Sequence, residues 1–509
     1  MKQLLTGNEA IARGAWEAGV CFASAYPGTP STEITEAIAG YGEVNAEWAP
    51  NEKVALEVGI GAALGGVRTL VCMKHVGLNV AADPFCTLSY TGISAGLVLI
   101  CADDPAMHSS QNEQDNRYYA RLAKVPMLEP STSQEAKDFV KLAFEMSEKF
   151  DTPVMVRVTT RISHSRGIVE LKTRKSLARK VFKPDPKKYV MVPSNARMRH
   201  RVVVERQKNI AEYGEKAPIN SIEPGKGDIG VVSAGVSYQY AREVFPQAHF
   251  LKIGLSNPLP KEMIRKFAKG KKKIFVVEEL EPFMEEQIAA MGIAVEGKSR
   301  LPEIDELNPD VVRDGFVKKR KPHKADVVEG LPNRPPNLCP GCPHRGLFSA
   351  IKPLKLVIFG DIGCYTLSVL PPLSTHDSCV WMGASIGMSH GYSKVGGNTT
   401  QKSVGVLGDS TFMHSGLTGV MEMAYNKGSN TVIILDNRTT AMTGGQNHPG
   451  TARTLKGEDT VSLNLEEVCR ALGVKRVFRV NPFEVKATRE VVKREISIEE
   501  PSVVISTAP

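Results

Sequence analysis

Two polar segments follow buried strands in the last third of the chain, and their side chains are of the types that bind metal ions and phosphates. The strand SVGVL runs into Gly408, Asp409 and Ser410, and the strand NTVIIL runs into Asp-Asn-Arg-Thr at 436–439. Ligands of an open parallel sheet bind beyond the carboxyl ends of its strands. We therefore expect both segments at the ligand-binding edge of one sheet.

The oxygen atoms of these segments suit Mg²⁺. Asp409 supplies a carboxylate, Asn437 a neutral side-chain carbonyl and Thr439 a backbone carbonyl, and phosphate oxygens and water would complete the shell. Gly408 would let the backbone approach a ligand closely. A turn aspartate and an asparagine that caps a strand are the structural alternative, and this pair alone does not decide between them.

Three cysteines could form a second metal centre. Cys339 and Cys342 make a CxxC motif, and Cys364 follows the strand KLVIFGDI. Three thiolates from two loops could bind a [4Fe–4S] cluster or, with His344 or a fourth cysteine, zinc. Structural cysteines without a redox role are the alternative.

The first third of the chain adds acid–base groups. Glu52 opens a predicted helix, NEKVALEVGIGAALGGVR, whose glycines allow close packing, and Glu57 follows in the same helix. His75 lies in the segment KHVGLN after a buried strand, so we expect it at the ligand edge. It could contact substrate or cofactor there, or be a structural histidine.

Two arginines could bind the carboxylate of a substrate. Arg117 and Arg121 follow the polar loop 111–115, and a guanidinium fork matches a carboxylate with two hydrogen bonds. A surface ion pair is the alternative for either arginine.

Short apolar strands that alternate with helices must position these groups, and this alternation predicts three doubly wound α/β domains with parallel sheets. In the first block we expect helices at 8–18, 52–65 and 133–149, the last with a capping box from Thr132 to Glu135, and strands at 69–73, 96–102 and 153–159. The strands expected in the second and third blocks are DIGVVSAG, HFLKIG, KKIFVVEE, KLVIFGD, SVGVLGD, NTVIILDN and PSVVIST.

Length and composition fit a globular protein of about three domains. The 509 residues are 42% hydrophobic and 23% charged, which is too apolar for a disordered chain. The sequence contains no run of eighteen apolar residues, so we expect no membrane span. Glu9 interrupts the N-terminus before a signal peptide could form. We therefore expect a soluble, cytoplasmic protein with reduced cysteines.

The net charge of +9 is concentrated in the segments 172–188 and 318–324. Neither contains interleaved aromatic residues or a nucleic-acid-binding module. We interpret them as solvated linkers or subunit-docking surfaces rather than nucleic-acid sites.

The third block resembles the diphosphate-binding domain of thiamine diphosphate enzymes. Asp409 and Asn437 are 28 residues apart, as in the motif that begins GDG or GDS and ends in Asn. The segment 437–446, NRTTAMTGGQ, is similar to 2-oxoacid:ferredoxin oxidoreductases, and GASIGMSHG at 383–391 resembles a small-residue helix of the same domain. The resemblance implies that the cofactor is held by Gly383, Gly408, Asp409, Ser410, Asn437, Thr439, Met442 and Thr443.

The first block resembles the pyrimidine domain of the same family. There a glutamate hydrogen-bonds the aminopyrimidine ring so that the ring can deprotonate the thiazolium carbon, and the spacing from Glu52 to Gly61 and Gly66 favours Glu52 over Glu57. Alignment of MLEPSTSQEAKD places the family's substrate arginine at Arg121. These matches imply catalytic roles for Glu52, His75 and Arg121.

The order of blocks resembles the large (alpha) subunit of the indolepyruvate ferredoxin oxidoreductases. It implies a pyrimidine-binding-type domain at 1–170, a basic linker at 171–225, a transketolase C-terminal-like domain at 226–300, a second linker at 301–334 and a thiamine diphosphate domain at 335–509. The motifs KHVGLN, VVEELEP, CPGCPHR and MTGGQNHPGT support the match.

The resemblance implies oxidative decarboxylation of arylpyruvates with CoA, using thiamine diphosphate and Mg²⁺ and passing electrons through iron–sulfur clusters to ferredoxin. It also implies a small beta subunit and a dimer of heterodimers, with no nucleic acid or membrane partner.

Two departures leave alternatives open. No cysteine follows the last predicted strand, where cluster-binding relatives have a fourth one, and neither Cys379 nor Cys469 matches that place. The ferredoxin-like C-x2-C-x2-C-x3-C-P run is also missing, as in a shortened chain or one whose clusters lie on another polypeptide. A non-oxidative thiamine lyase and a catalytically silent scaffold subunit are the alternative functions.

Overall fold

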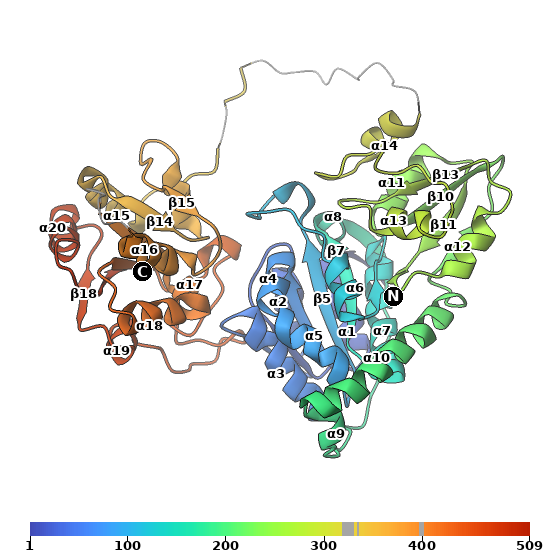
Figure 1. The fold of residues 1–509 in the computed structure, drawn as a ribbon, viewed down its shortest axis with the longest axis horizontal. Helices are drawn as coiled ribbons and strands as arrows, with labels where there is room; N and C mark the ends of the chain where they lie inside the picture. Colours follow the sequence, from blue (N-terminus) through green and yellow to red (C-terminus); the bar gives the residue numbers. More distant parts are fainter. Residues whose placement is uncertain (318–329, 333–334, 396–401, 509) are drawn as a thin grey trace. The chain divides into compact units, whose positions relative to one another are not determined.

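The computed structural model describes residues 1–317, 330–332, 335–395 and 402–508. They pack into two compact units, Met1–Asp326 and Val327–Pro509 (Figure 1). Both units are built from parallel-sheet α/β layers, which confirms the predicted fold class.

A seven-stranded sheet forms the centre of the first unit. All its neighbours pair in parallel except β12, which is antiparallel at one edge. The predicted strands at 69–73, 96–102 and 153–159 are confirmed as β4, β5 and β7. The strand order is β12 (Leu255–Asn257), β6 (Met127–Leu128), β7 (Val154–Thr159), β5 (Leu97–Asp103), β4 (Thr69–Lys74), β2 (Phe22–Ala25) and β3 (Asn45–Trp48).

The three helices predicted around this sheet are all present. They are α1 (Gly7–Glu17), α3 (Glu52–Leu64) and α7 (Ser133–Phe150). The Thr132 hydroxyl accepts a hydrogen bond from the Glu135 N–H at 3.1 Å, so this helix begins where its capping residues predict. The remaining elements are α2 (Thr32–Ala39), α4 (His75–Val80), α5 (Ala82–Thr91), a 3₁₀ turn (Pro105–Met107), α6 (Arg117–Ala123), α8 (Thr160–His164) and the antiparallel pair β1 (Lys2–Thr6) and β8 (Arg166–Glu170).

The middle block of the chain forms a four-stranded sheet in the same unit. Its three predicted strands are parallel, and a short β9 is antiparallel at the edge. The order is β13 (Lys273–Val277), β10 (Ile229–Ala234), β11 (His249–Ile253) and β9 (Ser221–Glu223), with helices α11 (Ser237–Val244), α12 (Lys261–Ala268), α13 (Phe283–Ala289) and α14 (Pro309–Phe316).

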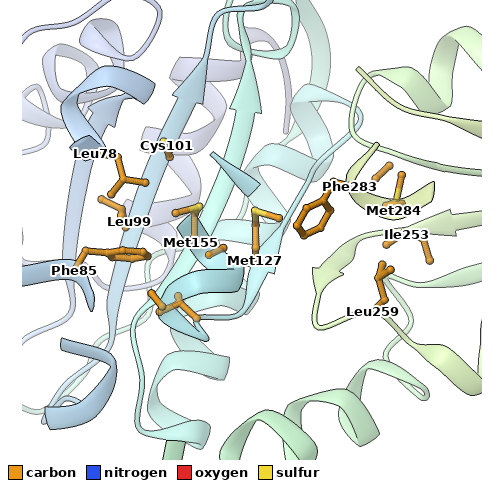
Figure 2. Packing of buried hydrophobic residues seen from close by; sticks show 14 of the residues in the cluster. Leu78, Phe85, Leu99, Cys101, Met127, Met155, Ile253, Leu259, Phe283 and Met284 are labelled. Carbon is orange, nitrogen blue, oxygen red and sulfur yellow. The ribbon is translucent and has the colours of Figure 1, made fainter. Parts of the chain in front are cut away.

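The two sheets of the first unit share one hydrophobic core. Met127 and Met155 of the seven-stranded sheet belong to the same buried cluster as Phe283 and Leu259 of the middle block (Figure 2). Buried ion pairs reinforce this junction, since Arg117 contacts Asp115 and Glu278 at 2.5 Å each, beside the shared apolar core. The first two blocks therefore pack as one body.

The basic segment 171–214 is ordered against the seven-stranded sheet, although its composition predicts a solvated linker. It holds 13 lysines and arginines against three aspartates and glutamates. It contains α9 (Pro186–Tyr189) and the 22-residue helix α10 (Pro193–Gly214). The long helix buries Val203 and Ile210, with Arg206 between them on the same face, and this buried arginine conceals the helical period in the sequence.

The cations of this segment lie on the carboxyl ends of the surrounding helices. Arg174 donates to the carbonyl oxygens of Trp16, in the last turn of α1, and of Val20, after this helix, at 2.9 Å each. Arg179 donates to the Gly65 carbonyl after α3 at 2.7 Å. The free carbonyl groups at a helix C-terminus carry partial negative charge. The excess of positive charge therefore satisfies helix ends.

The ends of α5 and α7 are held in the same way. Arg199 donates to the Tyr90 carbonyl at 2.6 Å, and Arg206 donates to the Ser89 carbonyl and, at 2.7 Å, to the Asp151 carbonyl. In a parallel α/β sheet the helix C-termini meet at the amino edge of the strands. The segment thus runs along the edge of the sheet opposite to the candidate site.

A six-stranded parallel sheet forms the second unit, and it contains the four strands predicted for the third block. The order is β15 (Ser378–Cys379), β14 (Val357–Gly360), β16 (Ser403–Gly408), β17 (Thr431–Asp436), β19 (Ser502–Thr507) and β18 (Arg476–Val480). The helices are α15 (Pro343–Ile351), α16 (Ala384–Val395), α17 (Asp409–Thr411), a π-helical turn (Phe412–Gly416), α18 (Leu417–Tyr425), α19 (Leu465–Ala471) and α20 (Val485–Glu495), with 3₁₀ turns at Lys352–Leu354, Cys364–Val369 and Ala441–Thr443.

None of the helices in the described ranges combines the length and the apolar character needed to cross a bilayer.

Candidate active site

Asp409 lies at the carboxyl end of β16, as its position after a buried strand predicts. Its Oδ1 accepts a hydrogen bond from the Ser410 N–H at 2.8 Å, and its Oδ2 accepts one from the Arg438 N–H at 2.7 Å. His448 Nε2 lies 3.2 Å from the same Oδ2. The buried carboxylate is therefore fixed by backbone N–H groups that follow two strand ends, with the imidazole of a residue 39 positions away beside it.

Asn437 and Thr439 lie beside this carboxylate. One polar atom of the Asn437 amide is 3.0 Å from the Thr439 carbonyl oxygen and 3.2 Å from Asp409 Oδ1. If this atom is nitrogen, it donates to both; if it is oxygen, three oxygens face one another. Adjacent ligands of an octahedral Mg²⁺ bound at about 2.1 Å lie about 3 Å apart. The arrangement fits a divalent cation in the second orientation.

The loop 437–446 folds back on itself above the strand ends. The Thr443 hydroxyl donates to Gln446 Oε1 at 2.6 Å, and Thr440 donates from its hydroxyl to Ser410 Oγ at 2.9 Å. Met442 projects from the turn of this loop and is 49% exposed. Ser410, Met442 and Thr443 are thus gathered at the edge where the sequence predicts a cofactor.

Gly383 occupies the turn that leads into α16. Its φ of +95° and the Ser415 side chain, 2.6 Å from where a Cβ would be, leave room only for glycine. The next residues are fixed by Asp361, whose carboxylate accepts from the Ser385 N–H at 2.9 Å and from its hydroxyl at 2.8 Å. Burial raises the pKa of Asp361 to about 7, against the hydrogen bonds from Ser385.

Gly408 has a packing role in addition to the one predicted. A Cβ there would lie 3.0 Å from the ring of Tyr365. The Tyr365 hydroxyl lies 3.4 Å from the Thr411 hydroxyl, and the tyrosine ring meets His344 edge to face, with ring centres 6.1 Å apart. Burial lowers the pKa of His344 to about 4, so its imidazole is neutral at pH 7.

The three cysteines lie in one region of the second unit. The pKa of Cys364 is raised by burial and further by the charges of Cys342 and Cys339, and Cys342 N–H donates to the Cys339 carbonyl at 3.1 Å. Across the described ranges, no three histidine, cysteine, aspartate or glutamate side chains are placed to hold a metal ion. The thiols are close, but their positions are not those of cluster ligands.

Glu52 is the first residue of α3 and is buried in the first unit. Asn51 caps this helix by accepting from the Val54 N–H at 2.9 Å. Gly77 of the KHVGLN segment admits the glutamate side chain, because a Cβ there would lie 2.6 Å from Glu52 Oε1. Glu57 is instead 45% exposed and pairs with Lys53 at 2.9 Å, one turn away.

Lys74 is a buried cation that the sequence motifs did not single out. Burial lowers its pKa to about 8, against the charges of Asp104 and Glu52, and its Nζ donates to the Ser109 carbonyl at 2.5 Å. Its signal in the sequence is its place at the end of β4. A lysine charge thus lies within electrostatic range of Glu52.

His75 is fully buried beside Lys74. Its Nε2 faces the Asn112 carbonyl oxygen at 3.2 Å and must donate to it, while its Nδ1 has no hydrogen-bond partner among the described residues. Burial, and then the charge of Lys74, lower its pKa to about 4. The His75 carbonyl accepts from Gln114 and Asn116. This neutral histidine therefore anchors the loop 104–116.

The two arginines separate in the structure. Arg117 is buried in the ion pairs of the junction with the middle block, whereas Arg121 is exposed in the last turn of α6. Arg121 alone remains open to an external carboxylate.

Family models match both candidate regions. One described as "Pyruvate flavodoxin/ferredoxin oxidoreductase, thiamine diP-bdg" matches residues 13–221, and one described as "Thiamine pyrophosphate enzyme, C-terminal TPP binding domain" matches residues 361–506. The first includes Glu52 and His75, and the second includes Asp409 and Asn437.

Curated relatives match over the whole chain. The chain is 44% identical to the indolepyruvate oxidoreductase subunit IorA of Methanothermobacter thermautotrophicus, covering 100% of this chain and 87% of the relative. It is 41% identical to the IorA subunit of Archaeoglobus fulgidus (100% and 86%) and 42% identical to that of Thermococcus kodakarensis (99% and 85%).

A solved structure supports the fold. The 2-oxoglutarate:ferredoxin oxidoreductase from Magnetococcus marinus, with 2-oxoglutarate, coenzyme A and succinyl-CoA bound, superposes with a TM-score of 0.52 at 16% identity. The match covers 62% of this chain and 64% of that chain. The chain belongs to the family of indolepyruvate oxidoreductase IorA subunits and is a thiamine diphosphate-dependent subunit of the 2-oxoacid:ferredoxin oxidoreductase class.

Proposed function

We propose that this chain, with a smaller beta subunit, oxidatively decarboxylates arylpyruvates such as indolepyruvate and phenylpyruvate. The acyl group passes to CoA and the electrons pass to ferredoxin. The observation that carries the proposal is the cluster formed by the Asp409 carboxylate, the Asn437 amide and the Thr439 carbonyl at two strand ends. The IorA relatives, aligned over the full chain, support the arylpyruvate substrate.

The second unit would hold the diphosphate end of the cofactor. Thiamine diphosphate, when bound, supplies an electron sink for breaking the bond between a 2-oxo carbon and its carboxylate. Asp409, Asn437 and Thr439 would hold Mg²⁺ through one carboxylate and two neutral oxygens. Ser410 and Gly383 would border the diphosphate, and Met442 and Thr443 would border the rings.

The first unit would supply the acid–base group. Glu52 is buried at a helix start, so its carboxyl can exchange a proton with a bound pyrimidine ring away from water. His75 would hold the loop 104–116 in place through Asn112, and Arg121 would bind the substrate carboxylate. We propose a dimer of heterodimers, as the resemblance to the family implies.

The electron path requires iron–sulfur clusters. Cys339, Cys342 and Cys364 are not placed as cluster ligands in the described residues, so they would hold a cluster only after rearranging and with a fourth ligand from elsewhere. Otherwise the clusters lie on another polypeptide. Iron and sulfide analysis of the isolated chain separates these two arrangements.

An anaerobic assay tests the reaction. The chain, co-purified with its beta subunit, is given phenylpyruvate, Mg²⁺ and thiamine diphosphate, and methyl viologen reduction and CO₂ release are followed with and without CoA. The proposal predicts dye reduction that depends on CoA. Release of CO₂ and aldehyde without dye reduction would instead identify a non-oxidative lyase. Formation of no product and no reduced dye would identify a silent scaffold.

Asp409→Asn tests the magnesium site separately from turnover. Loss of the only carboxylate in the proposed set should weaken Mg²⁺-dependent cofactor binding at least about 30-fold, roughly 2 kcal/mol, in calorimetric titration. Asp459→Asn is the control, since this carboxylate is 94% exposed in the same unit. Equal affinities in wild type and Asp409→Asn would remove Asp409 from the site.

A further inference from the structure

A cavity in the Val327–Pro509 unit shares only Asp409 with the proposed cofactor residues. It contains about 560 Å³ not filled by protein atoms, including its open mouth. Neither Asn437 nor Thr439 lines it, and Gly383, Ser410, Met442 and Thr443 do not line it either. The cavity therefore borders the proposed magnesium site through Asp409 alone.

Arg438 is the most informative residue of this cavity. Its φ of +54° is uncommon for a residue with a side chain. This conformation accompanies the N–H bond to Asp409 Oδ2 at 2.7 Å, while the exposed side chain lines the cavity. No hydrogen bond or ion pair joins the Arg438 guanidinium to any residue within the described ranges. The N–H donors of the Arg438 guanidinium are thus available to a ligand in the cavity.

Arg479 of β18 lines the same cavity. Its Nε donates to Glu466 Oε1 at 2.8 Å and its Nη1 lies 3.3 Å from the Thr507 hydroxyl, so it is held in place with part of its fork unused. It remains 41% exposed. Two guanidinium groups therefore border one space.

The carboxylates that line the cavity are engaged by other groups. Asp436 is buried and accepts from the Thr507 hydroxyl at 3.1 Å, and Asp409 accepts from two backbone N–H groups. Neither forms an ion pair with Arg438 or Arg479 in the part of the chain that the structure describes. Burial raises the pKa of Asp436, and the nearby charges of Arg438 and Arg479 partly offset this effect. The guanidinium N–H groups that bond to no group within the described ranges remain available to the oxygens of an anion.

The geometry points to a binding site for a phosphate-bearing ligand between Arg438 and Arg479. Guanidinium forks match phosphate oxygens in pairs, and Met413, Leu463 and Leu465 add an apolar wall for an organic part of the ligand. Two ligands could supply this phosphate group. One is CoA, and this assignment rests on the proposed function; the other is free phosphate. The site would hold the phosphate while Arg438 keeps its N–H on Asp409.

Calorimetric titration of the full chain tests this site. Inorganic phosphate and CoA are titrated separately at low salt into wild type, Arg438→Gln and Arg479→Gln. Loss of one guanidinium should raise the Kd of the bound ligand at least about tenfold, since charged hydrogen bonds contribute about 1.5–3 kcal/mol. Arg453→Gln is the matched control, because this arginine lies between β17 and α19, as Arg438 does, but is 66% exposed and does not line the cavity.

The two titrations identify the ligand and show whether the site exists. Binding of either phosphate or CoA that both cavity variants weaken and Arg453→Gln does not would support the site, and competition between the two would assign CoA to it. No saturable binding, or equal binding in all four proteins, would overturn it. Affinity of Arg479→Gln for thiamine diphosphate with Mg²⁺ should stay within threefold of wild type. The site can therefore fail while the proposed reaction stands, and dye reduction tests that reaction independently.

Discussion

The two edges of the seven-stranded sheet place their ionisable side chains in different environments. At the amino edge, arginines of the basic segment 171–214 donate to the carbonyl groups that end α1, α3, α5 and α7. At the carboxyl edge, Glu52, Lys74 and His75 are buried at helix starts and strand ends. There His75 Nδ1 has no hydrogen-bond partner in the part of the chain that the structure describes, and burial lowers the pKa of Lys74 to about 8.

The difference separates stability from chemistry within one layer. Cations at helix C-termini are in their favourable electrostatic place and are hydrogen-bonded. Buried ionisable groups with shifted pKa values cost stability and are typical of functional sites. Mutations at the amino edge should therefore change the free energy of unfolding, and mutations at the carboxyl edge should change turnover.

The largest effect is expected from Glu52→Gln at the carboxyl edge. The amide keeps the size of the side chain but cannot exchange a proton, so turnover should fall about 10³-fold while the melting temperature stays within about 2 °C. Dye reduction measures the turnover, and thermal unfolding of the same preparation measures the melting temperature. Unchanged turnover would show that Glu52 has no acid–base role.

At the amino edge, Arg206→Met should destabilise without affecting chemistry. The buried guanidinium donates to the Ser89 and Asp151 carbonyls, and leaving these unsatisfied should lower the free energy of unfolding by about 2–3 kcal/mol. Urea denaturation measures this loss. Lys208→Met on the same helix is the control, since its pair with Glu205 is exposed and contributes under about 0.5 kcal/mol. A loss of turnover per folded molecule in Arg206→Met would break the comparison.

His75→Gln should change the response to acid. The folded pKa of His75 is about 4, below its usual 6.5, so between these values the unfolded chain binds a proton that the folded chain does not. Wild type should then lose about 2 kcal/mol of stability between pH 7 and pH 5 that His75→Gln, whose amide can still donate to the Asn112 carbonyl, does not lose. Urea denaturation at the two pH values tests this, and parallel losses would refute a neutral His75.

The smallest effect is expected from Glu57→Gln. This exposed glutamate pairs with Lys53 one turn away, so its removal should cost no more than about 0.5 kcal/mol and leave turnover unchanged. Thermal unfolding and dye reduction again provide the readouts. A large loss of turnover here would transfer the acid–base role from Glu52 to Glu57.

Regular elements could be predicted where apolar periodicity decides them. The helix at 133–150 and the strands β4, β5 and β7 follow from their patterns. Strands β2 and β3, FASA and NAEW, were missed because they are short and contain small or polar residues. Helix α10 was missed because Arg206 stands where an apolar residue would reveal the period.

The strand ends could also be predicted, but not the contacts made across the chain. Asp409 and Asn437 follow apolar strands, and parallel pairing brings them together. Asp361 also follows a strand, but its contact with Ser385, 24 residues away, is one that no motif in the sequence indicates. His448 meets Asp409 through a folded loop, which no spacing in the sequence indicates.

The most direct test of Glu52 is the rate at which bound thiamine diphosphate exchanges the hydrogen on its thiazolium carbon for deuterium. The exchange is followed by proton NMR after acid quenching, in wild type, Glu52→Gln and Glu57→Gln, with Mg²⁺ and cofactor at saturation. It requires neither ferredoxin nor CoA. We predict equal rates in wild type and Glu57→Gln and a rate about 10³-fold slower in Glu52→Gln. Equal rates in all three proteins would contradict the assignment of the carboxyl edge as the site of proton transfer.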